Sequence, residues 1–402
     1  MNEKIRSDFP VTRDLVYLDS AYYGPYPLPV EQAGKDFLDT RTRGTSGRVN
    51  DWLEVMDQVR GTIAEVINAN PNEVAFTPNT TEGTNIVATS LRMGHGDNVV
   101  WDDLSYPSNA VVWLHQEGAR GIENRVVKHA EGAVHPEEFE RVVDSRTKVI
   151  SISHVSHRNG FVYDIEALAD LAHSCGAYLH VDAIQSVGAI QVDVKSAGID
   201  FLTCGTYKWL LGPIGLAFFY VREDLLPKLQ PVFGGEGQVK TWVDDYSVPL
   251  YPSELYESAK KFERATLHYQ GVYELKAALD YINGIGMNMI EEQVLRLSSR
   301  VWDGLQGLGS QLITPPETRS GIVSCTVADG QSMAQLLTDN RIVASVNPHD
   351  RGIQPAGEVG GSYLRISPHF FNTEEEIDHL LSVLESRLEL LRSPSGDGPI
   401  LA

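Results

Sequence analysis

Two residues of opposite charge stand where buried strands are expected to end. Lys208 follows the apolar run FLTCG (201–205) and precedes a Gly-Pro turn, and Asp182 closes the run AYLHVDA (177–183). Lysine and aspartate are seldom buried without a partner, so each needs solvent or a specific role. Taken alone, a strand-end aspartate is more often a cap or a structural hydrogen-bonding group. A lysine amine, however, can attack a carbonyl carbon, and a buried carboxylate can keep a ring nitrogen protonated.

A third stretch has the pattern of a phosphate site. In FTPNTTEGTNIVATSL (76–91) a strand pattern changes to a helix pattern, with Asn79 as N-cap and Glu82 three residues on, as in a capping box. Free N–H groups at such a helix start, with the Thr80 and Thr81 hydroxyls, can bind a phosphate. A capped helix without a ligand explains this stretch equally well. The motifs GxGxxG and GxxxxGK(S/T) are missing, which argues against a dinucleotide or a P-loop nucleotide.

Together these features match the requirements of one cofactor. Lys208 comes one crossover after Asp182, so the two residues are expected at neighbouring strand ends. Pyridoxal phosphate requires a lysine for a Schiff base, an aspartate at the pyridine nitrogen and a helix start for its phosphate. The sequence therefore predicts pyridoxal 5′-phosphate as cofactor, with Lys208 and Asp182 as catalytic residues.

The elements that must position these residues alternate between short apolar runs and amphipathic stretches. This alternation is typical of an α/β domain with a mainly parallel sheet. Strands are expected at 73–77, 97–102, 147–155, 177–183, 200–205 and 215–221. Because these runs are apolar on both faces, we expect helices on both sides of the sheet.

The pattern changes after about residue 225. A loop rich in Gly, Asp and Tyr precedes a long predicted helix from Val272 to about Leu308, and a smaller α+β unit follows, closed by a helix over 374–391. We expect a large α/β domain at 20–265, a smaller α+β domain at 266–391 together with 1–19, and a loose tail at 392–402.

Charge and cysteine content restrict partners and compartment. The net charge of −21 repels phosphate backbones and anionic lipids, so neither nucleic acid nor a membrane is an expected partner. The three cysteines have no CxxC spacing, which argues against a disulfide scaffold and a cysteine-based zinc site. The first residues lack the apolar stretch of a secretory signal, and apolar runs stay short of the roughly 20 residues that span a bilayer. We therefore expect a cytoplasmic protein.

Two motifs carry a resemblance to a known family. HVDAIQSVG (180–188), followed by GTYKWLLGPIG (205–215), is similar to the class V aminotransferase family of fold type I pyridoxal phosphate enzymes. That family includes cysteine desulfurases, cysteine and cystine lyases, kynureninases and isopenicillin N epimerase-like proteins. The resemblance extends from VYLDSA (16–21) to YLRISPHFFNTEEEIDHL (363–380), and it implies the fold type I transferase fold without selecting one reaction.

The resemblance implies a role for each matching cofactor residue. Lys208 matches the Schiff-base lysine, Asp182 the partner of the pyridine nitrogen, and Gln185 the residue that bonds the cofactor's phenolic oxygen. Thr80 and Thr81 match the phosphate loop.

Other matches concern the ring, the substrate and a second subunit. Tyr106 would stack on the pyridine ring, and Tyr207 would reach the phosphate. His157 stands near the phenolic oxygen, where desulfurases carry an Asn. Thr266 matches a threonine that reaches the partner subunit's phosphate, which implies a homodimer with shared active sites. Arg365 matches the arginine whose planar fork binds the substrate's α-carboxylate.

Several positions depart from the family pattern. Ile184 replaces a small residue under the ring, Ala265 replaces a common Gly, and Gly205 replaces a phosphate-binding Ser. His154 and His157 have the spacing of an HxxH metal pair, but on a strand this spacing points them to opposite faces, so no metal is expected.

The missing thiol is the most informative departure. Cysteine desulfurases carry a nucleophilic Cys on the loop that corresponds to 344–362, and this loop contains none. The patterns put Cys204 and Cys325 in strands and Cys175 at a helix end, as packing residues. Persulfide-forming desulfuration is therefore not expected.

Three reactions of an α-amino acid share the same first steps. The substrate displaces Lys208, and the released amine removes the α-proton while Asp182 sustains the ring. We rank transamination first, a β-eliminating or C–S lyase second and an epimerase third. A non-catalytic scaffold is the remote alternative. A scaffold would need neither Lys208 nor Asp182, and the sequence contains both. We expect Tyr22, Tyr23, Arg48 and the loop 345–361 to shape the pocket for the substrate side chain.

Overall fold

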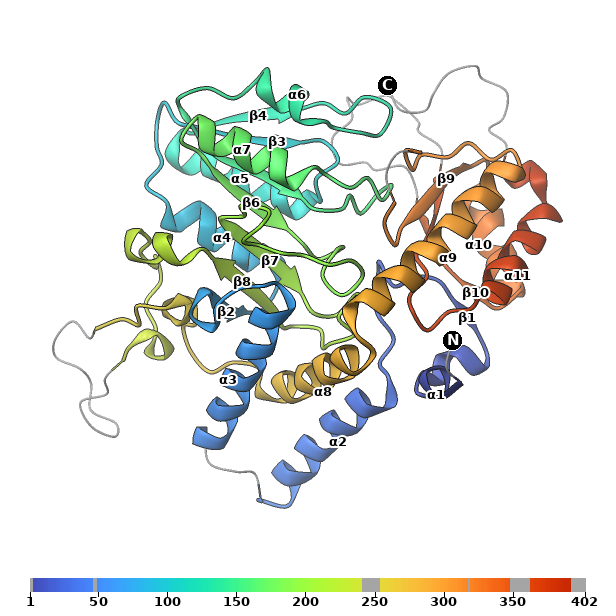
Figure 1. Ribbon diagram of the computed structural model, residues 1–402, viewed down its shortest axis with the longest axis horizontal. Coiled ribbons are helices and arrows are strands. Elements are labelled where there is room, and N and C mark those ends of the chain that lie inside the picture. The colour runs from blue at the N-terminus through green and yellow to red at the C-terminus, as the bar shows by residue number, and fades with distance from the viewer. Residues whose placement is uncertain (1–2, 46–48, 241–253, 317–318, 348–361, 392–402) are drawn as a thin grey trace.

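The computed structural model describes most of the 402-residue chain (Figure 1). The described residues are 3–45, 49–240, 254–316, 319–347 and 362–391. Three predictions fall outside them: the tail 392–402, Arg48, and most of the loop 345–361.

A seven-stranded sheet forms the larger part of the molecule. Its strands are β2 (Val74–Thr77), β3 (Asn98–Asp102), β4 (Glu123–Val127), β5 (Thr147–Ser153), β6 (Tyr178–Asp182), β7 (Phe201–Gly205) and β8 (Ala217–Val221). In space they follow the order β2-β8-β7-β6-β5-β3-β4. Of these seven strands, β8 runs antiparallel to the other six, which are parallel to one another. The predicted mainly parallel α/β sheet is therefore confirmed.

Helices cover both faces of this sheet, as the apolar runs predicted. Successive strand residues such as Phe201 and Leu202 enter two different apolar clusters. One cluster joins the sheet to α4 (Thr80–Ser90) and α5 (Pro107–Arg120). The other joins it to helices on the opposite face, which are α3 (Val49–Val66), α7 (Ile165–Ser174) and α8 (Tyr269–Ile285). The strand ends are thus held from both sides.

A second unit lies to the right of the large sheet in Figure 1. It contains the antiparallel sheet β11 (Ser345–Asn347), β12 (Ser362–Ile366) and β9 (Val323–Val327), and the parallel pair β1 (Val16–Tyr17) and β10 (Ile342–Val343). Its helices are α9 (Met287–Gly307), α10 (Gly330–Asp339) and α11 (Glu374–Glu385). The pair β1–β10 brings the start of the chain into this unit.

The remaining helices are short or lie near the N-terminus. They are α1 (Glu3–Ser7), α2 (Leu28–Thr42) and α6 (Pro136–Glu140). The α8 residues Val272 and Leu275 are buried in the same cluster as the large sheet. The predicted division at 265/266 stays a prediction, and by packing α8 joins the unit that precedes it.

The helix predicted from Val272 to Leu308 is wrong, because two helices occupy this range. Gly286, between α8 and α9, has φ +93°, a left-handed value that glycine adopts without steric cost. The closing helix predicted to residue 391 also ends early, since α11 stops at Glu385. Both errors arise because apolar spacing continues across a change of backbone direction.

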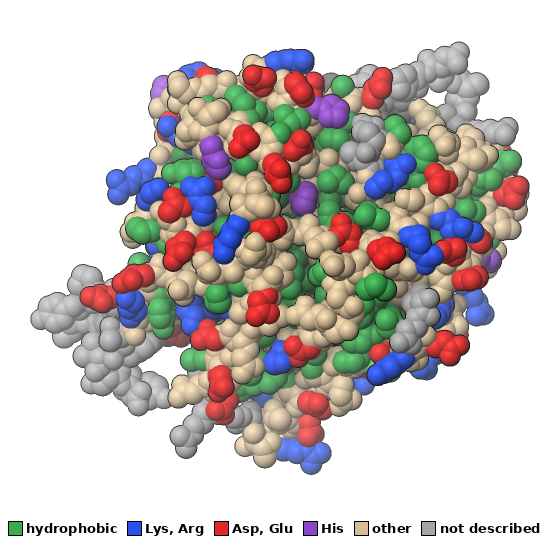
Figure 2. Space-filling model, viewed as in Figure 1, with side chains coloured by type: hydrophobic (Ala, Val, Ile, Leu, Met, Phe, Trp, Pro, Cys, Tyr) green, Lys and Arg blue, Asp and Glu red, His purple; other side chains and the backbone are tan. Residues whose placement is uncertain are grey.

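Charged side chains of both signs are interspersed over the face in Figure 2. On this face the described carboxylates are distributed among the lysines and arginines and do not form one acidic patch. In the described part of the chain, no helix combines the length and the apolar character that a membrane crossing requires.

Candidate active site

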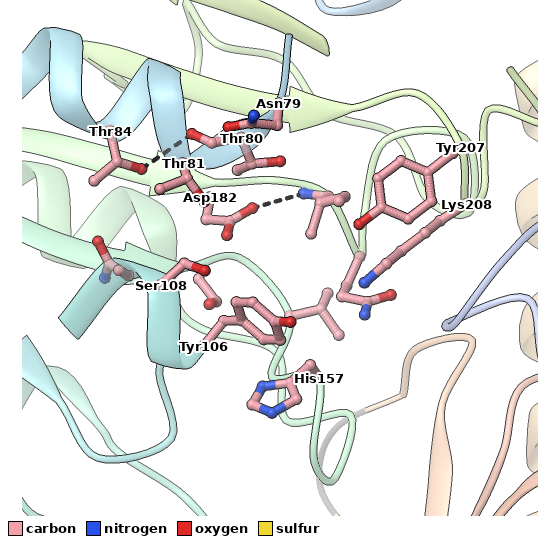
Figure 3. Close-up of a pocket in the computed structure, with 15 residues that line it drawn as sticks. Asn79, Thr80, Thr81, Thr84, Tyr106, Ser108, His157, Asp182, Tyr207 and Lys208 are labelled. Atoms are coloured by element: carbon pink, nitrogen blue, oxygen red, sulfur yellow. Dashed lines mark hydrogen bonds between the residues drawn. The ribbon is translucent and has the colours of Figure 1, made fainter. Parts of the chain in front are cut away.

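Lys208 lies in the turn after β7 and is almost completely buried, with 8% of its surface exposed. Its amine points into a cavity (Figure 3). Burial, followed by the positive charge of Arg365, lowers the pKa of Lys208 to about 8, while Asp182 opposes the shift. A minor but appreciable fraction of this amine is therefore neutral near physiological pH, far more than for an ordinary lysine.

Asp182 ends β6, the strand that pairs with β7, as the spacing predicted. Its Oδ1 accepts a hydrogen bond from Ile184 N at 3.1 Å. Burial raises the pKa of Asp182 to about 6, against the lowering effects of that hydrogen bond and of Lys208. Both charged forms are thus poorly solvated, which is the usual condition of groups that act on a ligand.

The start of α4 forms one wall of the cavity. Asn79 caps this helix by accepting a hydrogen bond from Glu82 N at 2.9 Å, while the Glu82 carboxylate pairs with Arg264. Thr80 Oγ1 is buried, and the described residues offer it no hydrogen-bond partner. Thr81 lines the same wall. A buried hydroxyl without a partner beside free helix N–H groups matches the chemistry of a bound phosphate.

Two positions that depart from the family pattern lie side by side in the cavity wall. A Cβ atom on Gly205 would lie 2.8 Å from Ile184 Cδ1 and 3.2 Å from Thr80 Oγ1. A side chain at position 205 would therefore require the end of the Ile184 side chain to shift. The backbone at Gly205 lies close to the Thr80 hydroxyl at the start of α4.

Aromatic side chains close the opposite side. Tyr106, the N-cap of α5, meets His157 edge to face at 5.0 Å between ring centroids. Lys208 Nζ lies 5.9 Å from the ring centroids of both Tyr106 and Tyr207. Burial, together with the charges of Arg365 and Lys208, lowers the pKa of His157 well below its usual value. His157 is therefore neutral at pH 7.

The argument from strand geometry against a metal pair of His154 and His157 is wrong. The strand predicted over 147–155 ends at Ser153, and a turn follows in which Gly160 N bonds Ser156 O at 3.0 Å. His154 and His157 therefore lie beyond the strand, and strand geometry does not set their directions. The expectation that the site holds no metal stays a prediction.

Arg365 on β12 lies beside this cavity and is 5% exposed. Its Nη1 donates to His157 O at 2.9 Å, and its Nη2 donates to Ser345 Oγ at 3.2 Å and to Asp19 Oδ1 at 3.4 Å. Arg365 Nε is buried and has no hydrogen-bond partner among the described residues. The guanidinium is thus anchored by an internal carboxylate and keeps a free donor for a ligand.

The cavity, of about 150 Å³, brings together most of the predicted cofactor residues. It is lined by Thr80, Thr81, Tyr106, His157, Asp182, Gln185, Tyr207 and Lys208. Gln185 is also tied to the protein, because its Nε2 donates to Ala21 O at 3.0 Å and its Oε1 accepts from Trp209 Nε1 at 2.9 Å. Thr266 does not join this group, since it is exposed and lines a separate pocket with Arg264.

The sequence analysis missed several residues of the site. Ser108, Asn109, Ser153 and Val155 line the cavity. Ser153 ends β5 beside Asp182, so the strand-end rule could have found it if the strand had not been extended to residue 155. Asp19 lies in the VYLDSA motif, but its contact with Arg365 spans 346 residues, and no local pattern reveals it.

Fold and site together define a class of protein. A mainly parallel sheet with helices on both faces presents a buried lysine, a buried aspartate and a helix start with an unpaired hydroxyl to one cavity. These groups fit pyridoxal 5′-phosphate, and the class is that of the fold type I pyridoxal phosphate enzymes.

Comparison with known families identifies the chain more closely. The family model "Aminotransferase class-V" matches residues 16–380. The chain therefore belongs to the class V aminotransferase family, and its cofactor is pyridoxal 5′-phosphate.

Similar proteins carry several names. A probable cysteine desulfurase of Methanothermobacter thermautotrophicus is 34% identical, with 95% of this chain and 97% of that protein covered. An uncharacterized aminotransferase, YcbU, of Bacillus subtilis is 29% identical, with 96% and 98% covered. The solved apo structure of a cysteine desulfurase from Thermococcus onnurineus has a TM-score of 0.86 at 28% identity, with 97% of this chain and 99% of that chain covered.

Proposed function

We propose that this enzyme cleaves the C–S bond of L-cysteine, or of an S-substituted L-cysteine, by β-elimination. The choice of substrate follows the relatives that are named cysteine desulfurases. The choice of reaction follows from one observation, which is that the chain offers no thiol at the site to receive the sulfur. Without such a thiol the sulfur leaves as a free thiol or as sulfide.

None of the three cysteines of the sequence lines the cavity. Cys204 on β7 is fully buried, its Sγ contacts Gly205 O at 3.4 Å, and burial raises its pKa well above the usual value. Cys325 on β9 is fully buried as well, and burial raises its pKa to about 12. Cys175 follows α7, where its Sγ contacts Ala172 O at 3.2 Å. A buried thiol with a raised pKa is a poor nucleophile.

The other residues of the site supply binding and proton transfer. Lys208, with a pKa of about 8, can take the proton from Cα of the substrate. Arg365 has a free Nε donor for the α-carboxylate. When bound, the cofactor supplies the electron sink that makes this proton acidic. We assign the ring nitrogen to Asp182, the phosphate to Thr80, Thr81 and Tyr207, the phenolic oxygen to Gln185 and His157, and the ring face to Tyr106.

The proposal predicts a definite set of products. L-cysteine and water give pyruvate, ammonia and hydrogen sulfide in equal amounts, and an S-substituted cysteine gives the corresponding thiol instead of sulfide. We expect all three products from purified holoenzyme when no keto acid acceptor is added. In the Lys208→Ala variant the rate of product formation should fall at least a thousandfold. Circular dichroism of the variant checks that its fold is intact. Alanine with enzyme-bound sulfane sulfur would instead mean desulfuration.

Transamination is the second candidate. It is compatible with the site, because the Lys208 amine that takes the proton can also return it. The relative YcbU is named an aminotransferase, although an uncharacterized one. In the same assay this reaction would yield a keto acid and a new amino acid only after a keto acid acceptor is added.

We also infer a homodimer with shared sites. Thr266 is exposed and lies apart from the Lys208 cavity, so a role at a phosphate requires a second copy of the chain. This assembly stays a prediction.

A further inference from the structure

Exposed tyrosines continue from the cavity to the surface. The aromatic wall, as we define it, consists of Tyr22, Tyr23, Tyr106 and Tyr207. Tyr106 and Tyr207 line the cavity (Figure 3), and Tyr23 contacts Tyr207 at 5.4 Å between ring centroids. Tyr22 meets Tyr23 at 4.4 Å in an edge-on arrangement. Three chain segments far apart in sequence therefore form one aromatic surface at the mouth of the site.

The segment that carries Tyr22 and Tyr23 is held firmly. Gly24 N donates to Tyr207 O at 2.9 Å, and a Cβ on Gly24 would lie 2.1 Å from Lys208 O. The hydroxyl of Tyr17 donates to Tyr23 O at 2.7 Å. Neighbouring Ala21 is tied on both sides, to Gln185 and to Ser367. The backbone that carries the two rings is thus fixed relative to the reactive lysine before any ligand arrives.

Within one copy of the chain, the described residues leave much of the wall exposed. Tyr22 is 56% exposed, Tyr23 is 39% exposed and Tyr106 is 44% exposed. Neighbouring exposed rings on a firmly held backbone are typical of a surface that binds a ligand or partner. The electrostatic interaction with Tyr22, followed by burial, raises the pKa of Tyr23. Burial raises the pKa of Tyr207 to about 12. Both phenols therefore stay uncharged, which suits an aromatic ligand.

We propose that the aromatic wall binds an aromatic ring on the side chain of the substrate. The inference rests on the proposed function in that the substrate is an amino acid held at Lys208. It names the substrate class as amino acids with a bulky aryl substituent beyond the β-carbon, such as S-benzyl-L-cysteine. Tyr22 and Tyr23 would then determine specificity, while Lys208 carries out the chemistry.

Binding of three ligands without a β-leaving group to the holoenzyme tests this inference. The ligands are L-2-amino-5-phenylpentanoate, L-2-aminoheptanoate and L-2-aminobutyrate, and calorimetry gives their dissociation constants. They carry carbon where the substrate has sulfur, so β-elimination cannot consume them. If the visible spectrum of the cofactor shows that a ligand is transaminated, the KM of that half-reaction replaces its dissociation constant in the comparison. We expect the phenyl ligand to bind about tenfold more tightly than the heptanoate, as ring pairing adds to simple apolar contact.

Variants assign the effect to the wall. Tyr22→Ala should reduce this tenfold preference to less than threefold, Tyr22→Phe should retain it, and Leu38→Ala, at an exposed apolar position on α2, should leave it unchanged. Equal affinity of wild-type enzyme for the phenyl ligand and the heptanoate would overturn the inference. A dimer that dissociates in Tyr22→Ala, measured by sedimentation, would also overturn it, because the wall would then be covered by a second copy of the chain.

Discussion

Two buried sets of a cation and a carboxylate lie against the same seven-stranded sheet and differ in how well they are partnered. Arg60 on α3 bonds Glu263 through Nη1 at 2.6 Å and Nη2 at 3.2 Å, and Nη1 also bonds Val74 O at 2.6 Å. Glu263 accepts a further hydrogen bond from Phe76 N at 2.8 Å. Lys208 and Asp182, by contrast, face a shared cavity, and no hydrogen bond of the Lys208 amine is found among the described residues.

The difference separates structure from function. Arg60 and Glu263 bond each other and nearby backbone groups, and this attraction offsets part of the cost of burying their charges. Lys208 and Asp182 are desolvated without full compensation, and their pKa values of about 8 and about 6 have moved toward neutrality. Unmet partners, rather than burial, mark the groups that act on a ligand.

Breaking the satisfied pair should have the larger effect on stability. Arg60→Ala leaves Glu263 buried without its partner, so the free energy of unfolding should fall by about 3–5 kcal/mol. Urea denaturation measures this loss. Arg43→Ala is the matched control, because Arg43 pairs with Asp39 at the surface, and its loss should stay within about 0.5 kcal/mol. Equal effects of the two substitutions would contradict the comparison.

Removing the unsatisfied amine should instead stabilise the protein. In cofactor-free protein, Lys208→Met should raise the free energy of unfolding by about 1–3 kcal/mol at pH 7. The pKa of Lys208 is lowered from 10.5 to about 8 in the folded state. Between these values the unfolded chain binds more protons, so wild-type stability rises with pH and the gain from the substitution fades.

Denaturation at pH 7 and pH 10 measures this change. Lys35→Met, at an exposed lysine paired with Glu31, serves as control. Its effect on the free energy of unfolding should be nearly the same at pH 7 and pH 10. If the gain from Lys208→Met were the same at both pH values, the destabilising effect of the buried ammonium would be refuted.

Arg365 is an intermediate case, and its substitution should have the smallest effect. It is partly satisfied by Asp19 and Ser345 and keeps one free donor. Arg365→Lys retains the charge but loses the planar fork, so L-2-aminobutyrate should bind about tenfold more weakly. Propylamine, which lacks the carboxylate, should bind with nearly unchanged affinity.

Calorimetry on the holoenzyme separates the two ligands. Arg300→Lys, at a surface ion pair with Asp378, is the control substitution and should change neither affinity. A similar loss for both ligands in Arg365→Lys would mean that Arg365 only supports the local structure and does not bind the carboxylate.

The sequence by itself determined the sheet and its chemically active edge. Apolar runs of strand length, such as 177–183 and 200–205, end at Asp182 and Lys208, and parallel strands bring such ends to one edge. The helix start at Thr80 was also predictable, because helix caps are local signals. These features depend on spacing within a few residues, which a single sequence contains in full.

Tertiary structure decided what depends on contacts between distant segments. It joined Arg365 to Asp19, placed Tyr23 against Tyr207, and brought Ile184 beside Gly205. It also separated Thr266 from the cavity of its own chain. Such contacts follow from the packing of whole elements, because a side chain's partner across the core is set by the orientation of two backbones and not by the residues beside it in sequence.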